Sequence, residues 1–249
     1  MFKKSIVVIA LTLSSLVAGT INIALSANVS YAIDSLKEEF HKAYPDTKVR
    51  VTLGSSGKLT AQIKHGAPYD VFLSANMLYP SLLYKEGQAI TQPVIYAKGS
   101  LVLLSRKDRD FKDGLVTILN NKIRRIAIAN PKTAPYGKAT FTALKNAKLY
   151  NGSRKKLIYA ESASQTLSYT MSVTDVGFVA KSSLFKSQLL GLKEGINWID
   201  VDATLYKPIE QGIVLLKHSK NAKESRAFYD FILSEKAKNI LKEYGYIVR

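Results

Sequence analysis

The feature that most constrains this sequence is a junction at which an alternating apolar run passes, through small polar residues, into an apolar pattern of helical period. In the clearest example, residues 49–53 alternate apolar and polar side chains, residues 54–57 are Gly-Ser-Ser-Gly, and Leu59 and Ile63 follow at helical spacing. The N–H groups of a helix's first turn have no partner inside the helix, and the helix dipole adds positive charge there. Such a turn can hold an anion, although an ordinary helix cap has the same pattern.

Four junctions of this kind occur, in two series along the chain. Each joins an expected strand to an expected helix through small or hydroxylic residues, at residues 26–30, 54–57, 133–137 and 162–164. Strands that alternate with helices predict an α/β fold with parallel sheets covered on both faces. In open α/β sheets ligands bind beyond the carboxyl ends of the strands, so two lobes that face each other would bring the four turns to one cleft.

The order of the expected elements defines the expected lobes. Apolar runs predict strands at residues 20–25, 71–73, 101–104, 126–129, 156–159, 176–180, 196–201 and 211–216. The strand at 101–104 begins a second series, and the strand at 211–216 can return the chain to the first. We therefore expect lobe 1 at residues 20–97 and 207–249 and lobe 2 at residues 98–206. The lone Trp198 is expected in the core.

Residues 1–19 have the features of a secretory signal. Lys3 and Lys4 precede an apolar run at residues 5–19, which is shorter than the roughly 20 residues of a membrane-spanning helix. Small residues place the expected cleavage after Gly19. The chain has no Cys, so neither a lipid-anchored Cys nor a disulfide can form. We expect a soluble exported protein that begins at Thr20.

The formal charge is +17, and removal of Lys3 and Lys4 with the signal leaves +15. An excess of positive charge favours anionic partners. The densest basic groups, at residues 124–125 and 154–156, are too short for a nucleic-acid-binding tail. We expect most of these side chains on a solvated surface and no nucleic-acid partner, and a surface adhesin or polyanion binder remains an alternative.

Motifs for catalysis fit poorly. A phosphate-binding P-loop would need Gly where Thr52 stands and Ser or Thr where Leu59 stands. Ser55 and Lys58 match the Ser-x-x-Lys spacing of some serine hydrolases, but the partner motifs Ser-Asp-Asn and Lys-Thr-Gly are absent. An exported serine hydrolase using these two residues remains the alternative from another class. The three histidines share no metal-ligand spacing, so neither a metal site nor a cofactor is expected.

Oxyanion binding by neutral donors is the chemistry that the four turns favour. None of the four turns contains an acidic residue, and Glu161, directly before the fourth, is the only one next to them; we interpret it as a charge near a helix N-terminus. Phosphate keeps a proton at neutral pH and benefits from a carboxylate acceptor, whereas a fully deprotonated anion needs donors only. The turns therefore favour a proton-free tetrahedral anion.

Several local motifs give the mature chain its resemblance to a known family, the periplasmic molybdate-binding proteins of bacterial ABC importers. The matching segments are residues 26–28, 54–59, 65–75, 176–179, 228–231 and 244–246. The resemblance implies a two-lobed periplasmic-binding-protein fold of type II, with each lobe a mostly parallel sheet flanked by helices. It also implies a non-enzymatic protein in the periplasm that holds molybdate or tungstate in the interlobe cleft and delivers it to a membrane permease.

The same resemblance implies which residues touch the ligand. Carried over by position, Asn28 and Ser56 would donate from side chain and backbone, and Ala27, Tyr136 and Ala163 mainly from backbone N–H groups. Molybdenum or tungsten would be bound only as the oxyanion, with no separate cofactor, and we expect a monomer. Among the residues of the second junction, Ser56 is the main candidate, and Lys58 is expected outside direct contact.

One position departs from part of the family. Some members have Ser at the position of Asn28 and a ligand-binding Tyr at the position of Ala180, so this chain resembles the branch that contains Asn. The missing hydroxyl at Ala180 leaves the number of donors from lobe 2 open. Sulfate, phosphate or another small oxyanion also remains an alternative ligand, because sequence does not give the size of the cavity.

Overall fold

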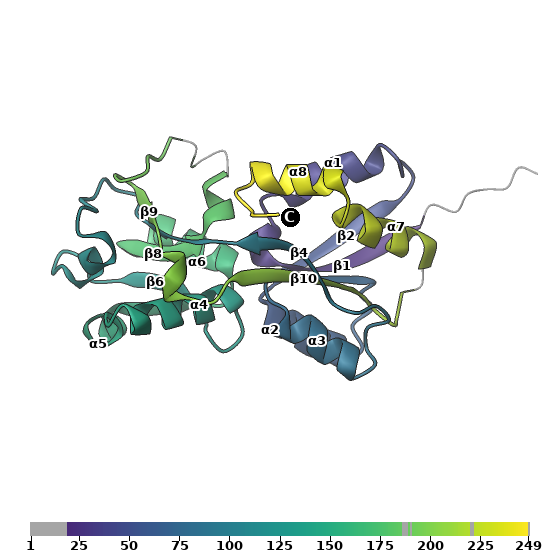
Figure 1. The fold of residues 1–249 in the computed structure, drawn as a ribbon, viewed down its shortest axis with the longest axis horizontal. Helices are drawn as coiled ribbons and strands as arrows, with labels where there is room; N and C mark the ends of the chain where they lie inside the picture. Colours follow the sequence, from purple (N-terminus) through teal and green to yellow (C-terminus); the bar gives the residue numbers. More distant parts are fainter. Residues whose placement is uncertain (1–18, 186–188, 190, 220–221, 249) are drawn as a thin grey trace, which may run out of the picture.

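Two sheets of five strands, each flanked by helices, form the two lobes of the chain (Figure 1). The computed structural model describes residues 19–185, 189, 191–219 and 222–248. Apart from Gly19, the predicted signal at residues 1–19 lies outside the described residues. No helix in the described ranges is long and apolar enough to cross a membrane.

Lobe 1 contains the sheet with strand order β2-β1-β3-β10-β4. The first three of these strands run parallel, whereas β10 is antiparallel to both of its neighbours. The strands are β1 (Thr20–Ser26), β2 (Lys48–Gly54), β3 (Val71–Ser74), β4 (Val94–Gly99) and β10 (Ile209–Leu215). The helices are α1 (Ile33–His41), α2 (Ser56–Lys64), α3 (Leu78–Lys85), α7 (Ala222–Ile232) and α8 (Glu235–Glu243), with a 3-10 turn, η1 (Ala27–Val29).

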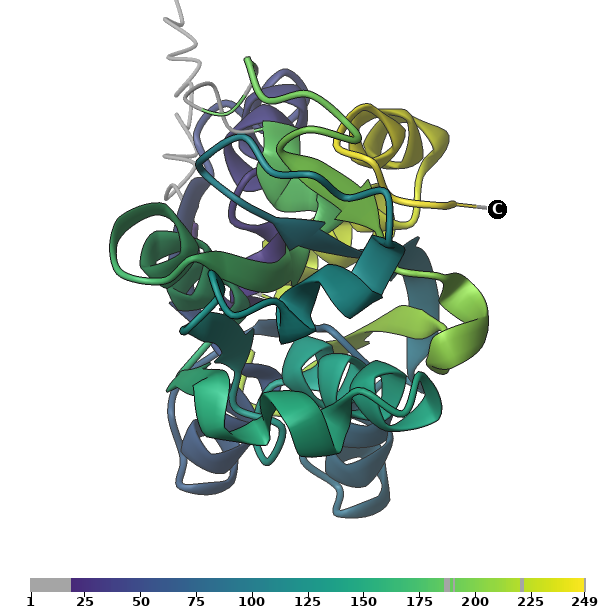
Figure 2. The same ribbon diagram turned by 90° about the vertical axis from the view of Figure 1, so that its left-hand side faces the viewer.

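Both faces of the lobe 1 sheet are buried, because side chains of β1 alternate between two sets of helices. Ile21, Ile23 and Leu25 belong to the core that also contains residues of α1, α7 and α8. Ala24 points to the opposite side and packs with residues of α2 and α3. Figure 1 and Figure 2 show the two sets of helices on opposite sides of the sheet. Burial on both faces explains why strands such as β3 have continuous apolar sequences.

Lobe 2 contains the sheet with strand order β7-β6-β8-β5-β9. Here β7, β6 and β8 are parallel, and β5 is antiparallel to β8 and β9. The strands are β5 (Leu101–Leu104), β6 (Ile126–Ala129), β7 (Leu157–Ala160), β8 (Val176–Ala180) and β9 (Trp198–Asp200). The helices are α4 (Pro135–Asn146), α5 (Tyr150–Ser153) and α6 (Ala163–Ser172), with the 3-10 helices η2 (Gly114–Leu119), η3 (Arg154–Lys156), η4 (Lys181–Phe185) and η6 (Ala203–Leu205).

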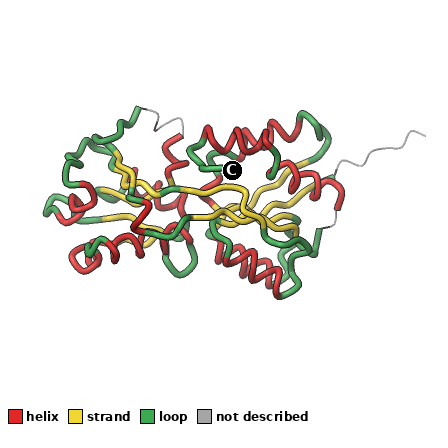
Figure 3. Tube along the Cα trace, viewed as in Figure 1, coloured by secondary structure: helices red, strands yellow, loops and turns green. Residues whose placement is uncertain are grey.

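The chain passes from lobe 1 to lobe 2 between β4 and β5 and returns between η6 and β10 (Figure 3). With this connectivity, the parallel strands of each lobe have their carboxyl ends toward the other lobe. The turns that follow β1, β2, β6 and β7 therefore meet at one place, as the four junctions predicted.

The structure confirms the predicted α/β class and the two-lobed arrangement, with local differences. The first junction, at residues 26–30, does not lead directly into a helix: Ala27–Val29 form the separate turn η1, and α1 begins at Ile33. Strand β4 was not predicted. Trp198 was predicted in the core, but it lies on the edge strand β9, is only partly buried, and has the Lys181 ammonium 5.3 Å from its ring centre.

Candidate anion-binding site

A small pocket lies between the lobes where the four predicted turns meet. Its empty space is about 190 Å³, including open solvent at the mouth. Its lining residues come from both lobes and are Ser26, Ala27, Asn28, Gly54, Ser55, Ser56, Ala75, Ala134, Pro135, Tyr136 and Ala163. The five residues predicted from the resemblance are all among them. Ala75, which follows the buried strand β3, was not predicted, although its place after a parallel strand is the same signal that identified the other turns.

Helix N-termini give the pocket its electrostatic character. Ser56 is the first residue of α2, Pro135 and Tyr136 are the first two of α4, and Ala163 is the first of α6. The first-turn N–H groups of these helices have no partner within their own helix, and the helix dipoles are positive at this end. The lining contains no Asp, Glu, Lys, Arg or His. The pocket can therefore stabilise an anion through N–H groups and dipoles without a charged side chain.

The Ser56 hydroxyl belongs to a buried cluster with Ser26 and Ala75. The hydroxyls of Ser26 and Ser56 are hydrogen-bonded to each other, and both accept the N–H of Ala75, at 3.1 and 2.9 Å. Two hydroxyls carry two protons, and only one is used in the bond between them. The second proton can therefore be donated to an oxygen atom in the pocket, which keeps Ser56 as a candidate side-chain donor.

The pocket is also lined by Ser55, which the sequence singled out only as a residue of the hydrolase alternative. It is the N-cap residue of α2, but its side chain makes no cap hydrogen bond, although Ser at this position normally accepts one. Its Oγ is buried and has no hydrogen-bond partner among the described residues. A buried, unpaired hydroxyl at a pocket is destabilising unless a ligand or water completes it. Ser55 therefore fits an oxygen-bearing ligand as a further donor.

Tyr136 can offer its backbone to the pocket while its hydroxyl lies deeper in the protein. A Cβ at Gly99 would overlap the Tyr136 hydroxyl, so the ring reaches the crossing between β4 and β5. This hydroxyl has no hydrogen-bond partner among the described residues. Burial raises the pKa of Tyr136 well above its ordinary value, with neighbouring tyrosines adding to the effect. The side chain therefore stays neutral and brings no negative charge close to the site.

Asn28 lines the pocket, but its side-chain amide is engaged elsewhere. The Nδ2 atom donates to Gln211 Oε1 at 2.8 Å and to the Tyr246 hydroxyl at 2.9 Å. These two acceptors can use both amide hydrogens. The donor that Asn28 has left for a ligand is its backbone N–H, in the turn η1.

Of the two lobe 2 positions Ala163 and Ala180, only Ala163 lines the pocket. Ala163 lies at the start of α6, where the Ser162 side chain caps the helix by accepting the Gln165 N–H at 3.3 Å. Ala180 is 1% exposed and belongs to the lobe 2 core, and it does not line the pocket. From lobe 2, the pocket therefore receives first-turn backbone groups of α4 and α6.

Lys58 and Glu161 lie outside the pocket lining and pair with each other. The Lys58 ammonium donates to Glu161 Oε1 at 2.6 Å, and each side chain is about half exposed. The Lys58 ammonium therefore lies at Glu161 and not at Ser55, and Ser55 Oγ has no hydrogen bond to any base among the described residues. The geometry required for the serine-hydrolase alternative is therefore missing.

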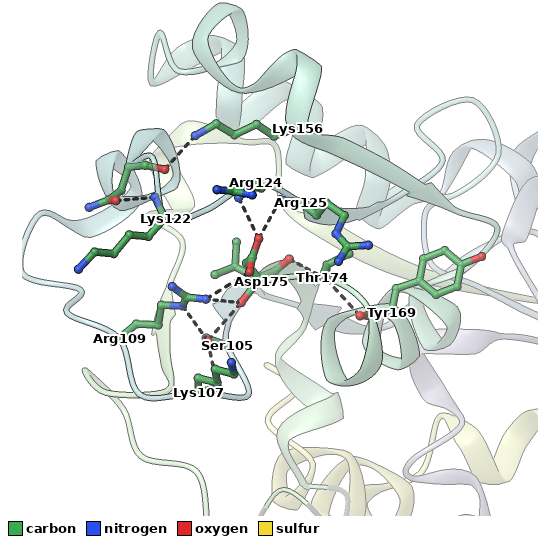
Figure 4. Close-up of polar contacts among 12 residues, drawn as sticks. Ser105, Lys107, Arg109, Lys122, Arg124, Arg125, Lys156, Tyr169, Thr174 and Asp175 are labelled. Atoms are coloured by element: carbon green, nitrogen blue, oxygen red, sulfur yellow. Dashed lines mark hydrogen bonds and ion pairs between the residues drawn. The ribbon is translucent and has the colours of Figure 1, made fainter.

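The basic groups that stood out in the sequence lie mainly at the opposite end of lobe 2 and make structural contacts (Figure 4). The backbone N–H groups of Arg124 and Arg125 donate to Asp175 Oδ2 at 2.8 and 3.0 Å. The Lys156 ammonium donates to three carbonyl groups at the end of η2, at residues 118–120. Some of the excess positive charge therefore stabilises the ends of lobe 2 elements.

In the described part of the chain, no group of three His, Cys, Asp or Glu side chains could hold a metal ion.

Comparison with known proteins agrees with this geometry. Residues 21–247 match the family described as bacterial extracellular solute-binding protein. The molybdate-binding protein ModA of Azotobacter vinelandii is 34% identical over 234 residues, which cover 92% of this chain and 90% of that protein. ModA of Rhodobacter capsulatus is also 34% identical, over 92% of this chain and 89% of that protein.

A solved structure extends the likeness to three dimensions. The periplasmic molybdate-binding protein of Azotobacter vinelandii superimposes with a TM-score of 0.84 and 31% sequence identity. The match covers 92% of this chain and 99% of that one, so both lobes are included. The similarity supports the predicted resemblance and a role in binding over the hydrolase alternative.

Proposed function

Since the chain belongs to the family of bacterial extracellular solute-binding proteins, we propose that it captures molybdate or tungstate in the pocket between its lobes. The observation that carries the proposal is the uncharged pocket at three helix N-termini and the turn η1. The names of its ModA relatives support the choice of anion.

The proposed donors are neutral groups from both lobes. They are the backbone N–H groups of Ala27, Asn28, Ser56, Tyr136 and Ala163, with the hydroxyls of Ser55 and Ser56. A hydrogen bond to a charged group contributes about 1.5 to 3 kcal/mol, so six or seven such bonds give on the order of 10 to 20 kcal/mol before the unfavourable terms. Association costs at least about 4 kcal/mol, which leaves room for micromolar to nanomolar binding.

The lack of a carboxylate in the lining favours a fully deprotonated anion. Hydrogen phosphate carries a proton that needs an acceptor, and no Asp or Glu lines the pocket. Molybdate, tungstate and sulfate need only donors at neutral pH. We propose that phosphate is rejected by this mismatch, and that sulfate is separated from the two larger anions by the fit of the donors around it.

Calorimetry with molybdate, tungstate, sulfate and phosphate tests this proposal. We expect one site with micromolar or tighter binding of molybdate and tungstate, weaker binding of sulfate and no measurable binding of phosphate. The proposal is wrong if molybdate and tungstate fail to bind, or if phosphate binds as tightly as they do.

The proposed cellular role follows from the family. The protein would act in the periplasm, after removal of the signal at residues 1–19, and would deliver its anion to the membrane permease of an ABC importer. N-terminal sequencing of the exported protein should give Thr20 as the first residue. Retention of residues 1–19 on the exported protein would contradict this part of the proposal.

A further inference from the structure

Asn28, whose turn lines the pocket, is held in place from within lobe 1. Its Nδ2 donates to Gln211 of β10 and to the Tyr246 hydroxyl, and that hydroxyl donates to the Asn28 carbonyl oxygen at 2.8 Å. Tyr246 is itself fixed to lobe 1, because the next residue, Ile247, exchanges two backbone hydrogen bonds with Lys98 of β4. Asn28, Gln211 and Tyr246 are all buried, so the turn has a defined orientation before any contact with lobe 2 is considered.

Ser182 of lobe 2 joins this buried network across the boundary between the lobes. Its Oγ donates to the Asn28 carbonyl oxygen at 2.9 Å and lies 3.2 Å from the Tyr246 hydroxyl. Ser182 is 3% exposed. It belongs to η4, which follows β8 directly and is tied to β9 by the ion pair between Lys181 and Asp200 at 2.7 Å. Movement of lobe 2 away from lobe 1 would therefore break the bond between Ser182 and Asn28.

We propose that Ser182 is a positioning residue that latches lobe 2 onto the Asn28 turn and slows the release of a bound anion. The inference rests on the proposed function, because it takes the Asn28 turn to be part of the anion site. An anion bound between the lobes leaves only after they separate, so each hydrogen bond that must break for this separation lowers the dissociation rate. A hydrogen bond that forms after the anion has entered has little influence on the association rate.

The buried position of Ser182 makes it a stronger latch than the exposed ion pair between Lys58 and Glu161. Lys58 and Glu161 also join the lobes, but both are about half exposed, and such pairs contribute little because water screens them. The Asn28 carbonyl oxygen accepts from two hydroxyls, those of Ser182 and Tyr246. When the lobes separate, it loses the bond from Ser182 and keeps the bond from Tyr246, and the loss of a buried hydrogen bond opposes the separation.

The adjacent Ser183 is a matched control. It is also buried, at 1% exposure, and its Oγ donates at 2.7 Å to the carbonyl of Ala180 within lobe 2. Ser182→Ala and Ser183→Ala therefore each remove one buried hydroxyl from the same 3-10 helix. They differ in whether the hydrogen bond that is removed crosses between the lobes.

Stopped-flow kinetics with molybdate and tungstate, together with melting of the ligand-free protein, tests the inference. We expect Ser182→Ala to raise the dissociation rate about three- to tenfold with the association rate unchanged within about twofold, as expected for one neutral hydrogen bond. Ser183→Ala should lower the melting temperature at least as much but leave the dissociation rate within about twofold of wild type. Equal dissociation rates for the two variants, or a change confined to the association rate, would overturn the inference.

If the wild-type protein binds neither anion, the proposed function is wrong. A second measurement, which needs no ligand, then still tests whether Ser182 holds the lobes together. The chain has no Cys, so Lys42→Cys in lobe 1 and Lys155→Cys in lobe 2 allow a single pair of spin labels to be attached. Both positions are exposed. We expect Ser182→Ala to shift the distance distribution toward more separated lobes, and Ser183→Ala to leave it unchanged. Identical distributions for the two variants would overturn the latch.

Discussion

The Lys58 ammonium lies 2.6 Å from the Glu161 carboxylate and joins α2 of lobe 1 to the turn before α6 of lobe 2. Because both side chains are about half exposed, the pair should contribute less than about 1 kcal/mol to holding the lobes together. We expect Lys58→Ala to weaken molybdate binding by no more than about fivefold, and the difference from wild type to shrink as salt is added.

Lys64 provides the control for this prediction, since its ion pair with Glu86 lies wholly within lobe 1 at 2.8 Å. Calorimetry at low and high salt should show no effect of Lys64→Ala on affinity. A hundredfold or greater fall in the affinity of Lys58→Ala would mean that Lys58 contacts the anion, contrary to its place outside the pocket lining.

Gly57 is a point of close approach between the lobes beside the pocket. Its N–H donates to the Thr133 carbonyl of lobe 2 at 2.9 Å, and a Cβ at this position would lie 2.7 Å from the Tyr79 hydroxyl and 3.0 Å from the Thr133 oxygen. Tyr79 belongs to α3 of lobe 1, so only the contact with Thr133 depends on how the lobes are arranged. We expect Gly57→Ala to weaken molybdate binding about tenfold or more, because overpacking costs about 1 to 3 kcal/mol and the Thr133 contact places this cost on the closed arrangement.

Any fall in the melting temperature of ligand-free Gly57→Ala should come from the contact with Tyr79 within lobe 1, since alanine suits the helix α2 better than glycine. Adding Tyr79→Phe removes the obstacle within lobe 1 and should restore the melting temperature but not the affinity, because the contact with Thr133 remains. Unchanged affinity in Gly57→Ala would show that the bound form does not need this close approach.

Ser55 and Ser56 differ in what their hydroxyls do without a ligand, and the two alanine variants should differ accordingly. Ser56→Ala removes a hydroxyl bonded to Ser26 and Ala75, so it should lower the melting temperature and weaken binding by about 1 to 3 kcal/mol. Ser55→Ala removes a buried hydroxyl that has no partner among the described residues, so it should weaken binding without lowering the melting temperature. Calorimetry and thermal melting on both variants check this. Unchanged affinity would remove the substituted residue from the site.

Asp175 should make the stability of lobe 2 dependent on pH. Partial burial alone would raise the pKa of this carboxyl, but the N–H groups of Arg124 and Arg125 and the charge of Arg109 outweigh it, so the pKa of Asp175 is lowered. A lowered pKa stabilises the folded state above the ordinary aspartate range, and this stability is lost as pH falls through the folded-state value. We expect Asp175→Asn to lose about 1 kcal/mol at pH 7 and to approach wild type below about pH 4.

Denaturant unfolding at several pH values measures the effect of Asp175→Asn. Asp46→Asn, at an exposed position, serves as the control and should match wild type throughout. A constant difference between Asp175→Asn and wild type from pH 7 to pH 3 would show that charge at Asp175 is not the cause.

The general fold could be predicted because the strand-to-helix junctions follow from local chemistry. Small polar residues between Leu53 and Leu59 mark both the end of β2 and the start of α2, and the same signal recurs in lobe 2. The edge strand β4 was missed, because its first two residues, Val94 and Ile95, are apolar but exposed, and its buried residues follow no clear alternation. Trp198 was misplaced because sequence alone does not tell an edge strand from a central one.

The backbone part of the candidate site was predictable and its side-chain partners were not. Turn positions such as Ala27 and Ala163 follow from the order of strands and helices. The contacts of Asn28 with Gln211 and Tyr246 join residues 183 and 218 positions apart, and no local pattern predicts such pairs. The sequence likewise does not show that the Ser55 hydroxyl is unpaired, because this depends on the groups that surround it in the folded protein.

A crystal structure of the protein with bound molybdate, phased on the anomalous signal of molybdenum, would locate the anion. We expect one metal atom between the lobes, with its oxygen atoms within about 3 Å of the N–H groups of Ala27, Asn28, Ser56, Tyr136 and Ala163 and no charged side chain in contact. An anion at the basic end of lobe 2, or one held in the cleft by Lys58, would contradict binding by neutral donors at the helix N-termini.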